Sequence, residues 1–130
     1  MRHIGVGVIL QDINGKFLLQ LRDNKKNIRY PNKWCIFGGG IEEGELPIDA
    51  AVREMKEELD LKLERSDLSL EYVFSRFTYK DYLFLSKKRI NPAKLKLHEG
   101  QAMKLFSRKQ IIFMRRVILR ERLWFIFHKK

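Results

Sequence analysis

The sequence predicts an α/β (α+β) fold in which a mixed β-sheet is flanked by helices. Apolar segments with strand-like and helix-like spacing alternate in the order strand, strand, strand, helix, strand, strand, strand, helix. Asn14-Gly15, a strong turn signal, separates the first two strand candidates. The first helix candidate, residues 47–59, repeats apolar residues three and four positions apart.

In the first half of the chain, Asn14-Gly15 predicts a hairpin whose returning strand alternates apolar and polar residues, with only Leu18 breaking the pattern. Pro47 suits the first turn of a helix, where its missing N–H is no loss. The expected elements are strands at 3–10, 16–22 and 34–37, a basic loop at 23–33, three glycines at 38–40 and a helix at 47–59.

The second half repeats this organisation, beginning with a second antiparallel pair of strands. Ser107 is a suitable N-cap for a final helical region that runs to the C-terminus. The expected elements are strands at 70–77, 79–87 and 102–106, a basic loop at 88–100 and the terminal helical region from 108. We expect residues 1–130 to form a single domain.

Composition favours a cytoplasmic protein with a packed core. The chain is 45% hydrophobic and has one cysteine, Cys35, so it cannot form an intrachain disulfide. The first residues lack the features of a signal peptide, and no apolar run approaches the roughly 20 residues that span a bilayer, so we expect no stable membrane insertion. Whether the chain is a monomer or a homodimer stays open.

The net charge of +11 is unevenly distributed. Residues 42–64 hold nine acidic and three basic residues, a net charge of −6, while the remainder of the chain carries +17. A basic surface attracts polyanions. The acidic block is either a solvated helix face or a site for a divalent cation.

The helix predicted at 47–59 brings three glutamates of this block together. Glu54, Glu57 and Glu58 are spaced i, i+3 and i+4, broadly opposite the apolar stripe. Three neighbouring carboxylates repel one another, and Arg53 and Lys56 are too few to balance them. Clustered hard oxygen ligands suit Mg²⁺ or Mn²⁺.

Glycines and glutamates stand at fixed spacing, and this spacing resembles the Nudix box. Gly39 is followed after five residues by Glu45, and after seven more by Arg53-Glu54-Met55-Lys56-Glu57-Glu58-Leu59-Asp60-Leu61. Asp60 stands where the family has Gly, a position that ends the helix and for which Asp is tolerated. The lead-in Trp34 to Glu42 and the segment His98 to Gln101 are also similar to the family. The resemblance implies the Nudix-type α/β/α sandwich.

The resemblance implies roles for the matching residues. It makes Glu54, Glu57 and Glu58 ligands of Mg²⁺, with Mn²⁺ as an alternative, and the Gly38 carbonyl a further ligand. It pairs Arg53 with Glu45 to hold the loop, which contains Gly39, to the helix. The general base in the family is a box glutamate or a distal acid, here Glu54 or Glu99. Glu99 is otherwise an ordinary loop acid. The catalytic and metal-binding set is therefore Glu54, Glu57, Glu58, Arg53, Glu99 and Gly38.

Substrate contacts are less well defined by the sequence. The basic loops offer cations for phosphates, and aromatic residues offer rings for a base, although core packing or a solvated surface is the favoured explanation for each of them. Gly39 and Gly40 allow close approach of the backbone. The expected substrate-binding residues are Arg22, Arg29, Trp34, Gly39 and Gly40, with Tyr30, Phe74, Phe77 and Tyr82 as further aromatic candidates.

The tail, residues 111–130, is apolar with interleaved arginines. It is either a terminal helix packed on the sheet or a basic amphipathic helix for a membrane or partner.

Several functions are consistent with the family resemblance and a nucleotide-like substrate. The first is a MutT-like pyrophosphohydrolase that converts a nucleoside triphosphate, a deoxynucleotide or an oxidised form to a monophosphate and pyrophosphate. The short chain favours it over ADP-ribose or nucleotide-sugar hydrolases. Removal of pyrophosphate from RNA 5′ ends is an alternative that the basic charge supports. A nucleotide-binding regulatory module without catalysis is the alternative outside enzymes, although it would be expected to lack box glutamates.

Overall fold

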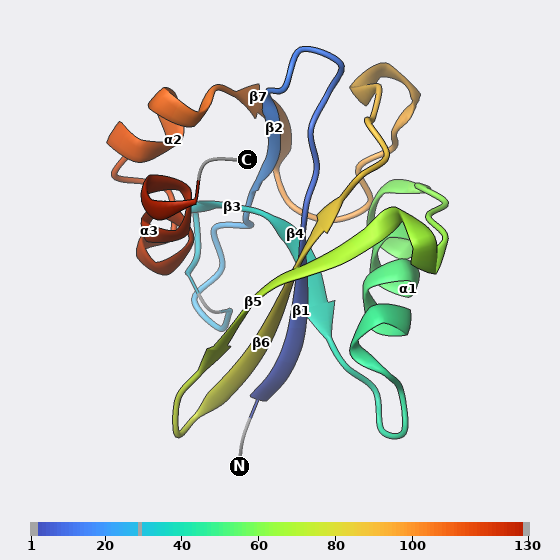
Figure 1. Cartoon of the computed structure of the whole chain (residues 1–130). Coiled ribbons are helices and arrows are strands. Elements are labelled where there is room, and N and C mark those ends of the chain that lie inside the picture. Colours follow the sequence, from blue (N-terminus) through green and yellow to red (C-terminus); the bar gives the residue numbers. More distant parts are fainter. Residues whose placement is uncertain (1–2, 29, 129–130) are drawn as a thin grey trace.

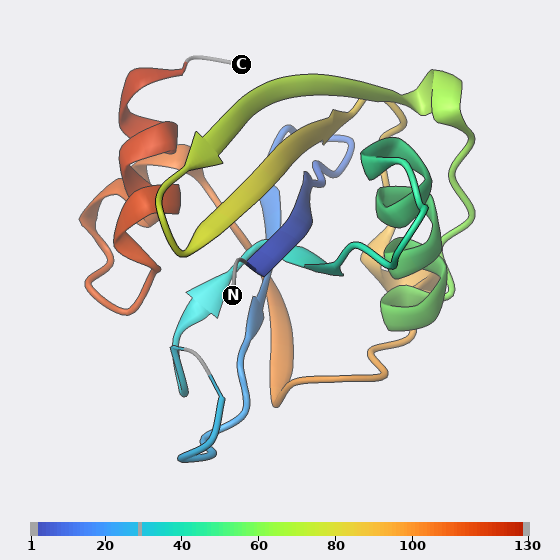
Figure 2. The same cartoon turned by 90° about the horizontal axis from the view of Figure 1, so that it is seen from below.

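Two β-sheets with helices on either side organise the computed structural model, which describes residues 3–28 and 30–128 (Figures 1 and 2). One sheet has the strand order β4-β1-β6-β5, and the other has the order β3-β2-β7. Helix α1 (Pro47–Leu59) covers one side, and α2 (Arg108–Phe113) and α3 (Leu119–Phe127) cover the other. The predicted mixed sheet flanked by helices is therefore confirmed.

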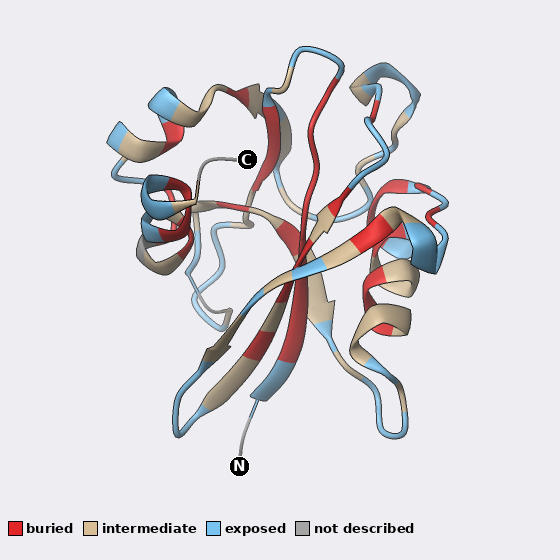
Figure 3. Cartoon of the chain, in the orientation of Figure 1, coloured by how far each residue is buried: buried red, intermediate tan, exposed pale blue. Residues whose placement is uncertain are grey.

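Strand β1 (His3–Ile9) is the centre of the larger sheet. It runs parallel to β6 (Tyr79–Ser86) and antiparallel to β4 (Phe37–Gly40), which makes the sheet mixed. The pair of β5 (Leu68–Ser75) and β6 is antiparallel, as the sequence predicted, with both strands starting or ending within two residues of their expected bounds. Figure 3 shows that burial is concentrated on the central strands and on the inner sides of the helices.

The first turn forms as predicted, but the hairpin does not continue beyond it. Gly15 has φ 79°, and the Asp12 carboxylate accepts hydrogen bonds from the backbone of Asn14 and Lys16. Strand β2 (Phe17–Leu21) then leaves β1 and pairs with β3 (Trp34–Cys35) and β7 (Ala102–Phe106). The cause is burial on both faces: Leu18 packs into one hydrophobic cluster and Leu19 into the other. This explains the interrupted alternation.

The three glycines, which were expected directly after a strand at 34–37, lie inside β4. The expected strand 34–37 is divided between β3 and β4, which belong to different sheets. A Cβ on Gly38 would lie 2.0 Å from the carbonyl oxygen of Val6 on β1. The glycine run thus permits close approach between two strands.

Helix α1 has the bounds that the sequence predicted. It begins with Pro47, and its C-cap Asp60 has φ 55°, a left-handed conformation. Met55 and Leu59 are fully buried in the first cluster, as expected from their apolar stripe. Glu58 departs from the prediction, because it is only 6% exposed and lies on the buried side. Its carboxylate therefore points into the molecule.

The tail forms two helices where the sequence predicted one helical region. Ser107 caps α2 by accepting a hydrogen bond from the Gln110 backbone, as expected. Residues 114–118 then interrupt the helix, because the Trp34 N–H donates to the Arg116 carbonyl and the Ile118 N–H donates to the Trp34 carbonyl. Those backbone groups pair with β3 and leave the helical pattern.

Helix α3 packs onto the sheet through its aromatic residues. Trp124 and Phe125 are buried in the second cluster, and the Phe125 ring meets the Phe17 ring edge-on at 4.8 Å. Within the described ranges, no helix has the length and apolar character needed to cross a bilayer. The packed terminal helix is thus the tail structure that forms.

Candidate active site

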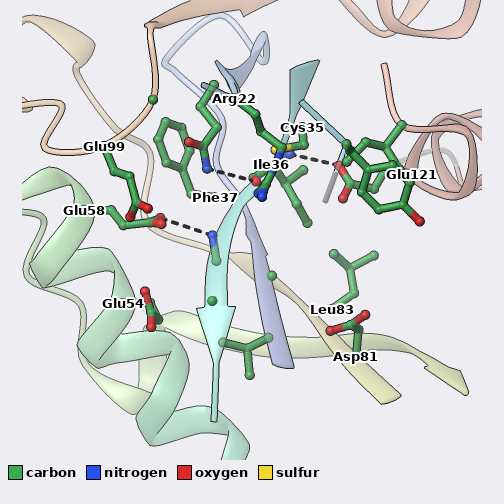
Figure 4. Close-up of a pocket in the computed structure, with 18 of the residues that line it drawn as sticks. Arg22, Cys35, Ile36, Phe37, Glu54, Glu58, Asp81, Leu83, Glu99 and Glu121 are labelled. Atoms are coloured by element: carbon green, nitrogen blue, oxygen red, sulfur yellow. Dashed lines mark hydrogen bonds between the residues drawn. The ribbon is translucent and has the colours of Figure 1, made fainter. Parts of the chain in front are cut away.

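A cavity of about 410 Å³ lies between α1, the central sheet and the start of α3. Its walls come from segments far apart in sequence, including β4, β6, the loop before β7 and the tail. Figure 4 shows Glu54, Glu58 and Glu99 on one side of β4, and Asp81 and Glu121 on the other. The cavity therefore has an acidic end beside α1 and a second polar end beside α3.

At the acidic end, β4 and α1 are in close contact. The backbone N–H of Gly38 donates to a Glu58 carboxylate oxygen at 3.2 Å. A Cβ on Gly39 would lie within 2.6 Å of both Glu54 carboxylate oxygens. The glycine run is thus the surface against which the two glutamates are placed, and both line the cavity.

Glu99 reaches the same end from the loop before β7. Backbone hydrogen bonds from His98 to the Glu58 carbonyl and from Lys96 to the Leu59 carbonyl hold this loop against the end of α1. The His98 ring also lies 2.9 Å from an Asp60 oxygen. The loop is therefore fixed so that Glu99 lies beside the two helix glutamates (Figure 4).

The electrostatics of this end oppose three ionised carboxylates. Burial, together with the charges of Glu54 and Glu99, raises the pKa of Glu58 to about 8, against the Gly38 hydrogen bond. Burial also raises the pKa of Glu54, although Arg53 counteracts it. A group of acids that resists ionisation in this way gains stability from a bound cation.

Glu57 takes a different direction from the other two glutamates of the motif. Its side chain is 57% exposed, lies 3.2 Å from Arg53 and is outside the cavity lining. Across residues 3–28 and 30–128, no three or more His, Cys, Asp or Glu side chains are arranged to hold a metal ion as they stand. The cavity thus brings together Glu54, Glu58 and Glu99, but not Glu57.

Arg53 connects the motif. Its guanidinium makes a two-pronged contact with Glu45, at 2.8 and 2.9 Å, and also donates to the Gly40 carbonyl at 2.9 Å and to Glu54 at 3.0 Å. The Arg53 hydrogen bonds lower the pKa of Glu45 to about 2. The glycine strand, the following loop and the helix are therefore joined through one side chain.

The predicted substrate contacts are divided by the structure. Arg22, Gly38 and Gly39 line the cavity, as do Tyr30, Phe74 and Tyr82, whereas a Cβ on Gly40 would meet open space. The structure differs from the prediction for Trp34, because its ring packs on Phe106 at 4.9 Å and lies outside the cavity lining. Phe77 is fully exposed, away from the cavity. Arg29 lies outside the described residues.

The second end contains residues that sequence reasoning missed. Arg120 on α3 donates to Asp81 on β6 at 2.6 Å, and Glu121 accepts a hydrogen bond from the Ile36 backbone at 2.9 Å. Burial raises the pKa of Glu121 to about 7. Burial alone would lower the pKa of Arg120, but the charges of Asp81 and Glu121 outweigh it and raise that pKa. About forty positions separate Asp81 from Arg120, so no local sequence pattern could have joined them.

Comparison with known proteins agrees with this geometry. The NUDIX domain family matches residues 1–123. The chain is 42% identical over 67 residues to the m7GpppN-mRNA hydrolase NUDT17 of Xenopus laevis, and 38% identical over 65 residues to that of Danio rerio. These matches cover 52% and 50% of this chain but only 22% and 21% of the relatives, so the chain matches about a fifth of their length.

Solved structures share the fold along most of the chain. A MutT protein from Methanosarcina mazei Go1 superposes with a TM-score of 0.77 at 22% identity, covering 96% of this chain and 91% of that one. A MutT NUDIX hydrolase from Burkholderia pseudomallei gives 0.77 at 19% identity, covering 99% of both chains. The family match over residues 1–123, together with this fold and the motif around Arg53, shows that the chain belongs to the Nudix hydrolase family.

Proposed function

We propose that this protein is a pyrophosphohydrolase that uses Mg²⁺, or Mn²⁺, to cleave a diphosphate bond in a nucleotide-like substrate. The observation that supports this most directly is the meeting of Glu54, Glu58 and Glu99 at one end of a cavity. Burial of Glu58, and then the charges of Glu54 and Glu99, raise the pKa of Glu58, and a divalent cation relieves this electrostatic condition. A non-catalytic module has no need of such crowding.

The donor set fits Mg²⁺ although no ready-made cage of three side chains is present. Mg²⁺ is commonly held by one or two carboxylates, with waters and substrate phosphates completing its shell. Glu54 and Glu58, one helical turn apart, would supply the carboxylates, and the Gly38 carbonyl would add an oxygen. Glu57 and Glu99 are the remaining family-implied ligands. When bound, the ion supplies positive charge for the phosphate oxygens and acidifies water.

The chain's own residues have separable tasks in this proposal. Arg53 fixes the position of Glu54 through its direct hydrogen bond and ties the glycine strand to α1. Arg22 lies between the two ends of the cavity, where its positive charge partly counteracts the rise in pKa of both Glu58 and Glu121. It is therefore placed to meet a phosphate. Either Glu54 or Glu99 accepts the proton of the attacking water. Loss of the acidic limb of the pH–rate profile in Glu54→Gln or in Glu99→Gln would identify the base, because the base is inactive once it is protonated.

Among substrates, we propose nucleoside triphosphates first, cleaved to a monophosphate and pyrophosphate in the MutT manner. The second end of the cavity, lined by Asp81, Arg120 and Glu121, offers polar contacts for a head group. The test measures turnover of nucleoside triphosphates, oxidised nucleotides, ADP-ribose and 5′-triphosphate RNA in the presence of Mg²⁺. Wild type is compared with Glu58→Gln, and Glu43→Gln, at an exposed position, is the matched control.

We expect turnover by wild type and by Glu43→Gln, and a loss of at least about 100-fold in Glu58→Gln together with weaker Mg²⁺ binding. Absence of turnover on every compound, with Mg²⁺ affinity equal in all three proteins, would refute the proposed enzyme.

RNA 5′ ends are a second candidate, which one structural observation favours. A second cavity of about 470 Å³ adjoins the first, since Tyr30 and Ile118 line both. Its other lining residues are Lys33, Arg115, Val117 and Arg122, three of which are cationic. A basic groove beside an aromatic ring suits a polynucleotide backbone, and the curated relatives above are named mRNA hydrolases.

This candidate predicts that substrate length matters. Turnover of 5′-triphosphate RNA should exceed that of GTP at low salt and fall steeply with added salt. Replacing Lys33 and Arg115 by Ala should lower the rate on RNA several-fold and leave the rate on GTP unchanged. Lys62→Ala, which removes an exposed cation outside both cavities, is the control. Equal salt dependence for GTP and RNA would contradict the candidate.

A further inference from the structure

Three charged side chains meet at the second end of the cavity, and two of them are buried. The side chain of Asp81 is 10% exposed and Glu121 is 5% exposed, while the Nε atom of Arg120 is buried and has no hydrogen-bond partner in the described part of the chain. The Arg120 guanidinium also lies over the rings of Phe74 and Tyr79, at 5.2 and 5.1 Å. None of these residues belongs to the Nudix motif.

Buried charges of this kind are costly to a fold. A buried ion pair is often no more stabilising than apolar residues of the same volume, because each charge loses its hydration. A purely structural role explains Glu121 in part, since it satisfies the Ile36 N–H. It does not explain why Asp81 and Arg120 line the cavity beside it. A ligand in the cavity would account for their placement.

The hydrogen bonds already made define what such a ligand must offer. Asp81 uses its Oδ2 atom for Arg120, and Glu121 uses its Oε1 atom for the Ile36 N–H. The Asp81 Oδ1 atom lies 3.5 Å from the His3 ring, which is longer than a normal hydrogen bond. Above the pKa of Glu121, the second oxygen of each carboxylate is thus an acceptor for a molecule in the cavity, and that molecule must bring N–H donors.

From this arrangement we infer that the second end selects a guanine-type head group through Asp81 and Glu121. Guanine presents a ring N–H and an adjacent amino group on one edge, and a carboxylate accepts both. Adenine and cytosine offer an amino group beside an acceptor, and uracil offers a single N–H between two acceptors. Phe74 and Tyr82, which also line the cavity, supply rings for a planar base.

This inference rests on the proposed function, because a diphosphate held at the acidic end directs the rest of the molecule toward Asp81 and Glu121 across β4 (Figure 4). Arg120 is a positioning residue in this scheme. It fixes the position of the Asp81 carboxylate by the 2.6 Å contact.

The first test uses the unaltered protein with GTP, ITP and ATP. ITP keeps the ring N–H of guanine but lacks the amino group. The comparison of GTP with ITP therefore measures the contribution of the amino group alone. We expect kcat/KM to fall in the order GTP, ITP, ATP, with a total range of about ten-fold or more. Equal values for the three nucleotides would overturn the inference.

The second test removes the acceptors singly. Asp81→Asn and Glu121→Gln keep the size of each side chain but replace an acceptor oxygen with a donor amide. Each should lower the GTP to ATP ratio of kcat/KM by about ten-fold or more, mainly by slowing GTP. Glu43→Gln, an exposed carboxylate away from the cavity, should keep the wild-type ratio. Wild-type ratios in both cavity variants would contradict the inference.

Direct binding separates this inference from the proposed function. Titration calorimetry of GMP, IMP and AMP with the Mg²⁺-loaded protein reports head-group selection without any hydrolysis. Tighter binding of GMP in a protein that turns over no triphosphate would support the selection and refute the enzyme. Turnover without a GMP preference would refute the selection and leave the enzyme. If Asp81→Asn fails to fold in a melting experiment, the GTP and ITP comparison on wild type decides.

Discussion

Gly39 and Glu54 approach each other so closely that a Cβ on the glycine would lie 2.4 Å from the carboxyl carbon of the glutamate. No real Cβ tolerates that separation, so the absence of a side chain on β4 determines where the Glu54 carboxylate lies. The contact adds to the hydrogen bonds that join β4 to α1, from the Gly38 N–H to Glu58 and from Arg53 to the Gly40 carbonyl. Gly39 is therefore a steric determinant of the proposed metal site.

Gly39→Ala should displace Glu54 while leaving the fold intact, because the clash involves a side-chain end and not backbone. We expect kcat/KM to fall about 100-fold, as for a misplacement of a reacting group by about 1 Å. Gly40→Ala adds the same methyl group to the same strand in open space and should retain most of the activity. Steady-state kinetics and thermal melting of both variants check this. Similar losses in the two variants would argue against a steric cause.

Arg53→Lys should reduce activity by about 10- to 100-fold. Lysine keeps the charge but cannot reproduce the two-pronged contact with Glu45 while also reaching Gly40 and Glu54. The matched control is Arg65→Lys, which disrupts a similar two-pronged contact with Asp49 on the exposed surface. That change should leave kcat/KM within about two-fold of wild type. A large effect in both variants would indicate general loss of stability, which melting would reveal.

Glu121 should make the protein less stable as the pH rises. Its pKa is about 7 in the folded chain against 4.5 for an ordinary Glu, so between these values the folded state holds a proton that the unfolded state has lost. The stability that the protonated group supplies is fully present below pH 4.5 and is lost as the pH rises through 7. Glu121→Gln keeps the hydrogen bond from Ile36 and should be more stable than wild type at pH 8 by about 2 kcal/mol.

Urea denaturation of wild type and Glu121→Gln at pH 4.5, 6 and 8 measures this difference, which should vanish at the lowest pH. Glu121→Ala provides the comparison, because it leaves the buried Ile36 N–H without its acceptor. It should destabilise the fold by about 1–3 kcal/mol at every pH. A constant difference between wild type and Glu121→Gln across the pH range would show that the carboxyl does not titrate in this window.

Asp60 occupies a left-handed C-cap position, with φ 55°, where the family motif has glycine. Asp60→Gly should retain activity and melt close to wild type, because relief of backbone strain offsets loss of the His98 contact. Asp60→Ala keeps the backbone strain and also loses the His98 contact, so it should melt about 3–5 °C below Asp60→Gly. Equal melting temperatures for the two variants would mean that the left-handed conformation is not the determinant.

Local signals in the sequence predicted those elements whose causes are local. The bounds of α1 follow from Pro47 and the spacing of apolar residues, and β7 has the bounds expected from residues 102–106. The turn at Asn14-Gly15 also formed. Partner choice was wrong for β2, because its neighbours depend on burial of Leu18 and Leu19 in two clusters that only the assembled chain contains.

The same distinction applies to the site. The motif predicted that Glu54 and Glu58 belong together, and the loop resemblance placed Glu99 with them, since each signal is carried within a few adjacent residues. Asp81 and Arg120 escaped prediction because their contact depends on the docking of α3 against β6. The break in the tail was missed for a similar reason, since its hydrogen bonds go to Trp34 on β3.

The attachment of residues 114–118 to Trp34 also imposes an order on synthesis. The acidic end of the cavity uses residues up to Glu99, so all of its parts leave the ribosome before the tail does. The opposite wall, with Ile118, Arg120 and Glu121, can be added only after this later segment has emerged and paired with β3. Under the proposed function, a nascent chain would therefore hold the metal-binding end of the cavity before it holds the end that selects the base.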